Sequence, residues 1–278
     1  MFAVWKQQAD VYHVTGDIHY VCCVLPKKKT LLTVHDCEVL HRLSGWKREI
    51  VRFFWYTHAA KHATRITVNS EETKRQLLKV IRYPAERIHV IPVSVSPLYQ
   101  PDKRPFNSDN PHILQVGTKL NKNVPRLVQA LQGLRCHLDI VGPVDEALRQ
   151  LLKVAQISWT GWGRLNDDQM YERYREADIV AFVSTHEGFG MPIVEAQCVE
   201  RVCVTSNLSS MPEVAGNGAC LVDPYDINSI RRGILRLTND STYRNSCLNH
   251  GRLNRERFNS QLIARQFGEV YRLISNGQ

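Results

Sequence analysis

Two carboxylates and two glycines stand close together where an apolar run gives way to a helical pattern. Glu187 and Glu195 are separated by seven residues, and Gly188 and Gly190 lie between them. Glycine lets backbone approach a ligand closely, and the N–H groups at the start of the following helix suit a phosphate. A carboxylate accepts hydrogen bonds from a vicinal diol, so either glutamate could hold a ribose or a sugar ring. On spacing alone, the alternative is a loop charge at Glu187 and a helix surface residue at Glu195.

The elements that must position these residues alternate along the chain. Short apolar runs typical of strands occur at 11–14, 31–34, 65–68, 88–91, 113–116, 137–141, 157–159, 179–183, 202–205 and 220–222. Helical patterns fill the gaps at 46–62, 71–80, 124–133, 145–154, 167–176, 191–199 and 227–237, and two amphipathic helices are predicted at 240–257 and 260–275. This alternation predicts an α/β fold with parallel sheets, and such sheets bind ligands beyond the carboxyl ends of their strands.

A proline-rich polar stretch divides the pattern into two parts. Residues 92–110 contain four prolines and no glycine, and the strand and glycine of HILQVG follow immediately. We expect an amino-terminal domain over 1–100, a linker over 101–110, and a carboxyl-terminal domain over 111–278 that includes the terminal helices. The first domain offers only four strands, fewer than a doubly wound domain usually has, so we expect it to be incomplete.

The run HEGFGMPIVE resembles the E-x7-E motif of retaining glycosyltransferases of the GT-B fold, family 4 type. The segments ILQVGTKLNKNVPRLVQAL, CHLDIVG, YREADIVAFVS and CLVDPYDINSIRRGI are similar to the family's order of strands, loops and helices. The resemblance is dense over residues 111–275 and looser over 11–100. It implies two Rossmann-like domains whose sheets face across a cleft, and a sugar transferred from a nucleotide diphosphate with retention of configuration.

The resemblance also implies the catalytic residues, which would be Glu187, His35 and Lys122. Glu187 would lie near the transferred sugar, and Lys122 would neutralise the diphosphate, where negative charge builds as the glycosidic bond breaks. His35 follows the strand LLTV, where similar enzymes carry a histidine near the donor sugar. A structural histidine is the alternative.

The resemblance further implies a donor-binding set, with Glu195 on the ribose hydroxyls. The set is Gly117, Lys119, Lys122, Gly188, Phe189, Gly190 and Glu195. Lys119 stands near the place where the family has an arginine, and it is either a substitute cation or a solvated loop lysine. Trp162 or Arg164 either contacts the base or caps its loop, which leaves UDP and GDP both open. The resemblance also implies that no metal and no other cofactor is needed, because in many enzymes of this fold such cations and a helix end replace a metal.

Positive charge is concentrated in the first part of the chain. Residues 1–110 contain 17 Lys and Arg against 10 Asp and Glu, within a formal net charge of +9. The segment 46–62 interleaves aromatic and basic residues, and it is either a core helix with a basic edge or a face that meets anionic lipid. No nucleic-acid motif accompanies the charge, so we expect none as a partner. The expected partners are a nucleotide sugar, a saccharide or lipid-linked acceptor, and a membrane surface.

The eight cysteines lie mostly within apolar runs. None belongs to a CxxC pair with a matching His or Cys pair, so we expect no zinc site and interpret them as buried thiols in a reducing compartment. Residues 1–10 lack a signal-peptide core, and the apolar runs are too short to span a bilayer. We therefore expect a cytoplasmic enzyme, peripheral on the membrane, that builds surface polysaccharide or glycolipid. The alternative is a non-catalytic nucleotide-sugar-binding remnant that lacks the first Rossmann unit.

Overall fold

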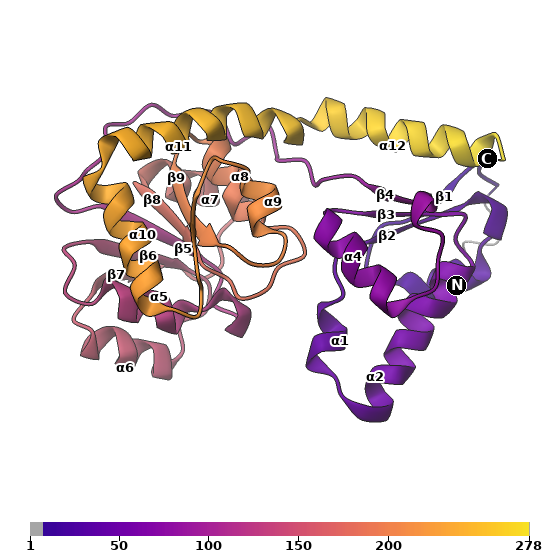
Figure 1. Ribbon diagram of the computed structural model, residues 1–278, viewed down its shortest axis with the longest axis horizontal. Helices are drawn as coiled ribbons and strands as arrows, with labels where there is room; N and C mark the ends of the chain where they lie inside the picture. Colours follow the sequence, from indigo (N-terminus) through magenta and orange to yellow (C-terminus); the bar gives the residue numbers. More distant parts are fainter. Residues whose placement is uncertain (1–7, 278) are drawn as a thin grey trace. The chain divides into compact units, whose positions relative to one another are not determined.

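The computed structural model describes residues 8–277, except for the side chain at position 41. The chain divides into two compact units, each with its own parallel sheet (Figure 1). Unit 1 comprises Met1–Ser94 and Ser260–Gln278, and unit 2 comprises Val95–Asn259. The two parallel sheets confirm the predicted α/β class. The signal-peptide prediction concerns residues that lie largely outside the described ones.

No helix in the described part of the chain is both long and apolar enough to cross a bilayer.

Unit 1 is built on a four-stranded sheet in the order β1-β2-β3-β4. The strands are β1 (Tyr12–Val14), β2 (Thr30–Val34), β3 (Arg65–Val68) and β4 (Ile88–Val90). The helical segments are η2 (His19–Val24), η3 (Lys27–Lys29), α1 (Glu38–Arg42), α2 (Gly45–Val51), the π-helix η4 (Arg52–His58), α3 (Ala59–Lys61), α4 (Glu71–Val80), η5 (Ala85–Arg87) and α12 (Ser260–Ser275). Strand β2 is buried along its whole length, as an inner strand rich in apolar residues should be.

Unit 2 is built on a six-stranded sheet in the order β10-β9-β8-β5-β6-β7. The strands are β5 (His112–Val116), β6 (His137–Val141), β7 (Ser158–Gly161), β8 (Ile179–Phe182), β9 (Val202–Ser206) and β10 (Cys220–Val222). The helical segments are η6 (Leu120–Lys122), α5 (Val124–Leu131), α6 (Glu146–Val154), α7 (Asp167–Glu176), α8 (Met191–Cys198), α9 (Met211–Ala215), α10 (Ile227–Asn239), α11 (Ser241–Asn254) and η7 (Arg255–Phe258).

The strand order of unit 2 reverses between β5 and β8. The chain first runs outward from β5 through β6 to β7, and then returns to build β8, β9 and β10 on the other side of β5. Ligands of open α/β sheets bind at such a reversal, beyond the carboxyl ends of the two strands concerned. The loop after β5 and the loop after β8 therefore define the place to look for a site.

The expected linker is wrong, because its residues lie against unit 2. Phe106 packs against the core of unit 2, and the N–H of Asn107 donates to the Asp178 carboxylate at 3.0 Å. Arg201 donates to the carbonyl of Asp102 at 2.6 Å. The prolines of this stretch prevent regular secondary structure, but the stretch is not a flexible linker, because it packs against unit 2. The domain change lies instead near residues 94 and 95.

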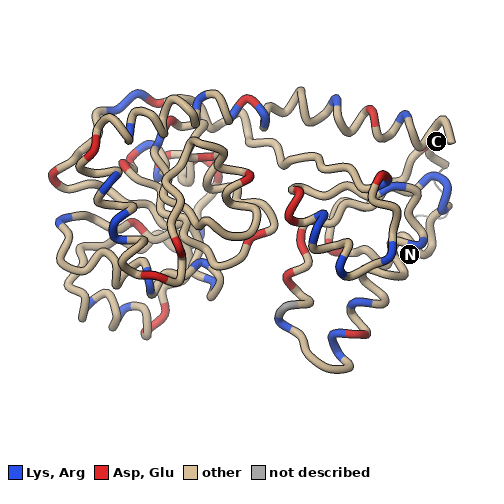
Figure 2. The backbone as a smooth tube through the Cα atoms, in the orientation of Figure 1, with Lys and Arg blue, Asp and Glu red and all other residues tan. Residues whose placement is uncertain are grey.

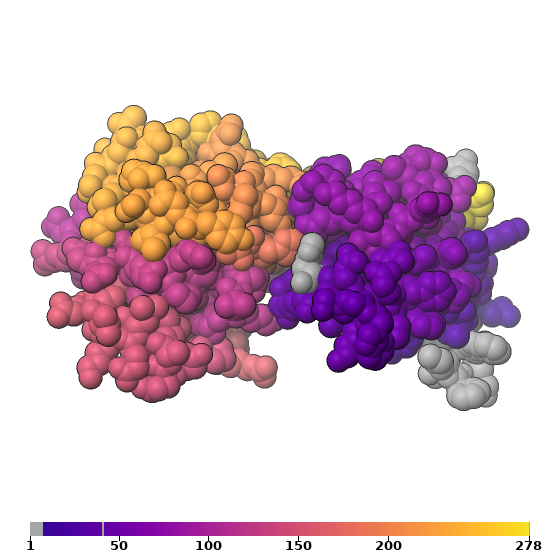
Figure 3. All heavy atoms as spheres, turned by 60° about the horizontal axis from the view of Figure 1, so that its bottom comes forward, coloured from indigo at the N-terminus to yellow at the C-terminus, as the bar shows by residue number. Residues whose placement is uncertain are grey.

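Helix α12 was expected in the carboxyl-terminal domain, and this assignment is wrong. Its apolar residues Ile263, Val270 and Ile274 form one buried cluster with Leu31 of β2 and with Ile91, all within unit 1. Figure 1 shows the helix running along this sheet, and Figure 3 shows its yellow end at the edge of the indigo unit. The spacing of 263, 270 and 274 predicts an apolar stripe on a helix, but a stripe does not specify which sheet covers it.

Candidate active site

The loops that follow β5 and β8 meet at the strand reversal of unit 2. The two strands pair in parallel, with Gln115 beside Ala181, so their carboxyl ends reach the same edge of the sheet. Beyond that edge, the N–H of Thr185 donates to the carbonyl of Asn121 at 2.8 Å. The Asn121 side chain in turn donates to the carbonyl of His186 at 3.1 Å. These bonds hold the two loops side by side.

The hydrogen bonds between the loops bring Lys122 and Glu187 into an ion pair. Lys122 Nζ lies 2.7 Å from Glu187 Oε1, and Asn121 Nδ2 donates to the same oxygen at 3.1 Å. The side chains are only 17% and 14% exposed. The ammonium also lies 4.5 Å from the centre of the Phe182 ring, at the end of β8. The catalytic lysine and glutamate predicted from the resemblance are thus one cluster, although 65 residues separate them.

Gly117 provides the room that Lys122 needs. Its φ is +83°, in the left-handed region that side chains disfavour, and a Cβ there would lie 3.2 Å from Lys122 Cε. The absence of a side chain at Gly117 therefore lets the lysine side chain pass close to the backbone, while the contact of Gly117 with the donor stays a prediction. Lys119 lies exposed in the same loop.

The glycine loop after Glu187 turns directly into helix α8. Gly190 is the residue before the helix, with a φ of +114°, and a Cβ on it would lie 3.1 Å from Ile193. Ser210 Oγ donates to the carbonyls of Glu187 at 3.0 Å and Phe189 at 2.7 Å, which fixes the loop. The Phe189 ring is buried against Phe258, so its backbone is the part available to a ligand. The positive end of the α8 dipole lies at the same sheet edge as Lys122.

Glu195 lies about one turn into α8, and its carboxylate is held from inside the protein. The hydroxyl of the buried Tyr174, on α7, donates to Glu195 Oε2 at 2.5 Å. Burial raises the pKa of Glu195 above its usual value, while the Tyr174 hydrogen bond lowers it in part. This partnership contradicts the alternative of an ordinary helix surface residue. The Tyr174 hydrogen bond engages Oε2 of the carboxylate and not Oε1.

His35 lies in unit 1, just beyond the carboxyl end of β2. Its side chain is exposed, and its Nε2 makes a 2.7 Å hydrogen bond with the carbonyl of Thr15. Since a carbonyl only accepts, Nε2 carries the proton and Nδ1 is the acceptor in this tautomer. The role of His35 towards the donor sugar stays a prediction.

Several residues that shape the site were not found by sequence reasoning. Asn123 adopts a left-handed φ of 59° before α5, and its buried amide donates to the carbonyls of Val183 and Pro224. Tyr174 and Ser210 reach the site from other elements, and no spacing in the chain reveals this. The repeated asparagines of LNKN are the one local signal that loop geometry matters here.

The proposed base-contacting residue Trp162 has partners within its own domain. Its indole N–H donates to Asp139 at 2.7 Å, and the Arg173 guanidinium lies 3.9 Å from the centre of its ring. These contacts favour the alternative in which Trp162 caps the loop after β7.

Comparison with known proteins assigns both halves of the chain. Residues 99–254 match the family model described as glycosyl transferases group 1, and residues 2–97 match the model described as glycosyltransferase family 4. The first match alone covers more than half of the chain. The chain belongs to the group 1 glycosyl transferases. The predicted family is therefore confirmed, and the ion pair of Lys122 and Glu187 lies within the matched region.

Curated relatives of this glycosyltransferase include several bacterial mannosyltransferases. O-antigen chain mannosyltransferase B of Escherichia coli is 25% identical over 273 residues, covering 89% of this chain and 71% of that protein. The serotype-specific mannosyltransferase WbdA of Escherichia coli is 30% identical over 182 residues, which are 59% of this chain and 21% of that protein. The MMP alpha-(1->4)-mannosyltransferase of Mycolicibacterium hassiacum is 26% identical, with coverages of 81% and 59%.

Solved structures show the same fold. Sucrose-phosphate synthase from Thermosynechococcus elongatus superposes with a TM-score of 0.81 at 20% identity, over 100% of this chain and 77% of that one. WaaG, a glycosyltransferase involved in lipopolysaccharide biosynthesis, gives a TM-score of 0.71 at 15% identity, over 97% and 79%. Together with the two parallel sheets, these neighbours confirm the GT-B type.

Proposed function

We propose that this glycosyltransferase moves a hexosyl group, such as mannose, from a UDP- or GDP-sugar to a saccharide or lipid-linked acceptor. We further propose that it retains the anomeric configuration and serves the synthesis of a surface polysaccharide or glycolipid. The mannosyltransferases among its relatives support the sugar and the pathway class. The E-x7-E spacing of Glu187 and Glu195 supports retention.

The observation that carries the proposal is the paired Lys122 and Glu187 at the strand reversal of unit 2. A cation, a carboxylate and a helix N-terminus meet there, within the loops after β5 and β8. The cation and the helix N-terminus suit the negative charge of a diphosphate, and the carboxylate suits a sugar hydroxyl. Glu195, with one oxygen held by Tyr174, would accept hydrogen bonds from the ribose through the other.

In this mechanism Lys122 exchanges its carboxylate partner for an oxygen of the donor diphosphate. The bond between the sugar anomeric carbon and the phosphate oxygen breaks, and negative charge builds on the leaving diphosphate beside Lys122 and the α8 N-terminus. The acceptor hydroxyl forms the new bond to the same face of the anomeric carbon, and its proton passes to the leaving phosphate oxygen. Glu187, released from Lys122, accepts a hydrogen bond from a hydroxyl of the transferred sugar.

We propose that transfer needs no metal, because Lys122 and the helix end supply the positive charge at the diphosphate. Turnover that survives exhaustive treatment with EDTA would support this. Turnover lost with EDTA and restored by added Mg²⁺ would contradict it.

The test is sugar transfer by the purified chain from a panel of UDP- and GDP-hexoses, with and without saccharide acceptors. Lys122→Met should reduce kcat by about 10²–10³-fold, the usual effect of removing one transition-state charge partner. Lys153→Met, on the exposed face of α6, is the matched control and should leave transfer unchanged. NMR of the product anomeric proton reports retention or inversion. Tight nucleotide binding with no turnover for any donor would instead support the remnant hypothesis.

We also propose that unit 1 rests on an anionic membrane through α2 and η4. Side chains spaced three or four residues apart are exposed along this helix, with Trp46 at 71% and Phe54 at 53%. Lys47 lies beside Trp46, and the exposed Lys27–Lys29 turn adds charge to the same unit (Figure 2). Exposed aromatic rings with neighbouring lysines are typical of interfacial helices. These two rings lie outside the core, whereas Tyr56, Ala59 and Ala60 of the same helical segment are buried in it, as the core-helix alternative expects.

Co-sedimentation with vesicles tests this contact. Phosphatidylglycerol vesicles should bind the protein, and the double variant Trp46→Ser with Phe54→Ser should bind them at least tenfold more weakly. Leu253→Ser removes an equally exposed apolar side chain from unit 2 and should bind as the parent does. Equal binding by all three proteins would overturn the proposal, and equal binding to neutral vesicles would show that charge plays no part.

A further inference from the structure

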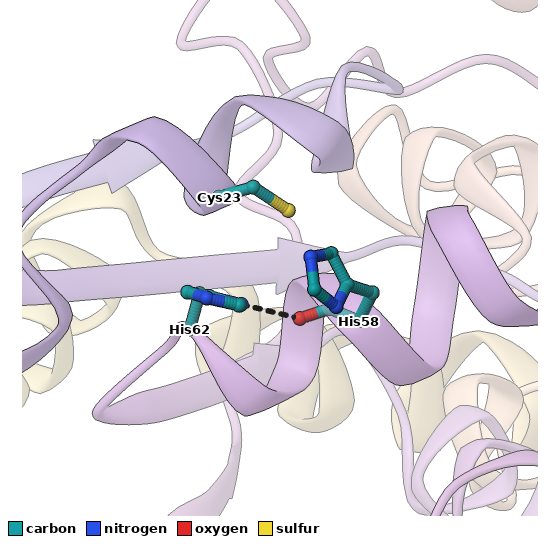
Figure 4. A group of neighbouring side chains, drawn as sticks. All are labelled: Cys23, His58 and His62. Carbon is teal, nitrogen blue, oxygen red and sulfur yellow. Dashed lines mark hydrogen bonds between the residues drawn. The ribbon is translucent and has the colours of Figure 1, made fainter.

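Cys23, His58 and His62 come together in unit 1, far from the donor-binding loops in the chain. One possible ligand atom from each residue lies within 4.8 Å of the other two. Cys23 belongs to η2, His58 ends the π-helix η4, and His62 follows α3. Figure 4 shows the sulfur of Cys23 pointing toward the imidazole of His58, with His62 one helical turn further along. No local motif predicts this group, because the cysteine and the histidines are 35 or more residues apart.

The two histidines are already arranged as ligands would be. They are four residues apart, so their side chains leave the same face of the helix, and their ring centres lie 4.6 Å apart. His62 Nδ1 lies 2.9 Å from the carbonyl of His58, so Nδ1 carries the proton and Nε2 has the free lone pair. A backbone carbonyl commonly fixes the tautomer of a metal-bound histidine in this way.

The π-helix orients His58 in addition. In a π-helix, residues five apart are neighbours, and the His58 ring stacks on Phe53 with centres 5.7 Å apart and planes 19° apart. Seven consecutive π-helical residues are unusual, and such segments occur frequently at functional sites. Stacking reduces the rotational freedom that His58 would lose on binding a ligand.

We propose that Cys23, His58 and His62 bind a zinc ion that ties η2 to the helix formed by α2, η4 and α3. One thiolate and two imidazoles are a ligand set that zinc favours, and water would complete a tetrahedral ion. Binding removes the proton of the Cys23 thiol to solvent, and the Zn–S bond replaces it. Tetrahedral zinc needs its ligand atoms roughly 3.5 Å apart, and small side-chain rotations would bring atoms that already lie within 4.8 Å of one another to this separation.

The position of the site indicates a structural role. His62 lies three residues before β3 begins, at the amino edge of the unit 1 sheet, whereas His35 lies just beyond the carboxyl end of β2. Catalytic groups of parallel sheets gather at the carboxyl edge, so the zinc would stabilise unit 1 without entering the transfer reaction.

Metal content and thermal unfolding of the full chain test the proposal, and neither requires sugar transfer. After incubation with ZnCl₂ and dialysis, the parent should retain one equivalent, and saturating zinc should raise Tm by about 5 °C or more. Cobalt(II) should give a thiolate-to-metal absorption band together with the visible bands of tetrahedral coordination. Cys23→Ser should lose that charge-transfer band, and His62→Gln should retain less than a tenth of the zinc.

Two matched variants guard against chance binding. Cys198→Ser removes another partly buried thiol and His250→Gln removes an exposed histidine, both in unit 2, and both should bind zinc as the parent does. Zinc retained equally by Cys23→Ser and His62→Gln, or a cobalt spectrum without thiolate in the parent, would overturn the proposal. So would a parent that retains no zinc.

Discussion

Changing the two charges of the Lys122–Glu187 pair one at a time should affect nucleotide binding in opposite directions. In the free enzyme, Glu187 occupies the ammonium that the donor diphosphate is proposed to use, at 2.7 Å. A hydrogen bond to a charged group contributes about 1.5–3 kcal/mol, and we take the lower end because both side chains keep some exposure. In the parent, the diphosphate must displace Glu187 from Lys122, and this cost lowers its affinity by roughly tenfold. Glu187→Gln should bind UDP or GDP about tenfold more tightly, and Lys122→Met about tenfold more weakly or worse.

Isothermal titration with the nucleoside diphosphate that lacks its sugar is the appropriate measurement. It isolates the diphosphate contact from any contact between Glu187 and the sugar. Glu172→Gln on α7 changes net charge by the same amount as Glu187→Gln, and Lys153→Met matches Lys122→Met, so both controls should keep the parent affinity. In transfer assays Glu187→Gln should still lose activity, because tighter binding of the diphosphate does not replace the sugar contact.

Equal weakening of diphosphate binding in both variants would refute this reasoning. The pair would then be a fixed framework whose removal disturbs the loops after β5 and β8. If neither variant changed the affinity, the diphosphate would bind elsewhere in the protein.

Three other perturbations test the surrounding geometry. Tyr174→Phe removes the hydrogen bond that opposes the raised pKa of Glu195. The carboxylate that the ribose requires should then form only at higher pH, and the acidic limb of the kcat/KM profile should move upward; an unchanged limb would argue against Glu195. Gly117→Ala should lower unfolding free energy by about 1–2 kcal/mol, since its φ of +83° disfavours a side chain, whereas Gly268→Ala in α12 should raise it by about 0.5–1 kcal/mol. Ile263→Ala should cost about 2–4 kcal/mol, and hydrogen exchange should show faster opening in unit 1 than in unit 2; the reverse pattern would contradict the placement of α12.

Much of the secondary structure was predictable because its causes are local. All ten predicted strands are present within two residues of their expected ends, and the glycine loop with α8 lies where the E-x7-E pattern placed it. Apolar runs of four or five residues form buried strands where helices cover both faces of a parallel sheet. Gly190 and Pro192 mark the start of α8, and both act through the conformation of only a few neighbouring residues.

The missed features all depend on contacts between distant segments. The sequence shows the apolar stripe of α12, but it does not show which of the two sheets that stripe packs against. The aromatic residues of 46–62 form a helix as expected, and only the packing of unit 1 leaves Trp46 and Phe54 exposed while burying Tyr56. Likewise, no short motif reveals that Cys23 lies beside two histidines, because this cluster arises across the fold; the expectation of no zinc site stays a prediction.

The sequence by itself determined the α/β class, the two-sheet organisation, the family and the residue types of the candidate site. Hydrophobic periodicity, turn residues and motif spacing act over a few residues, so they can be recognised without knowledge of the fold. Only the tertiary structure decided that Lys122 pairs with Glu187, that Tyr174 holds Glu195, and that the chain returns to unit 1 at its end. The reason is physical: an apolar face or a charged group specifies what kind of partner it needs, and packing selects which one it meets.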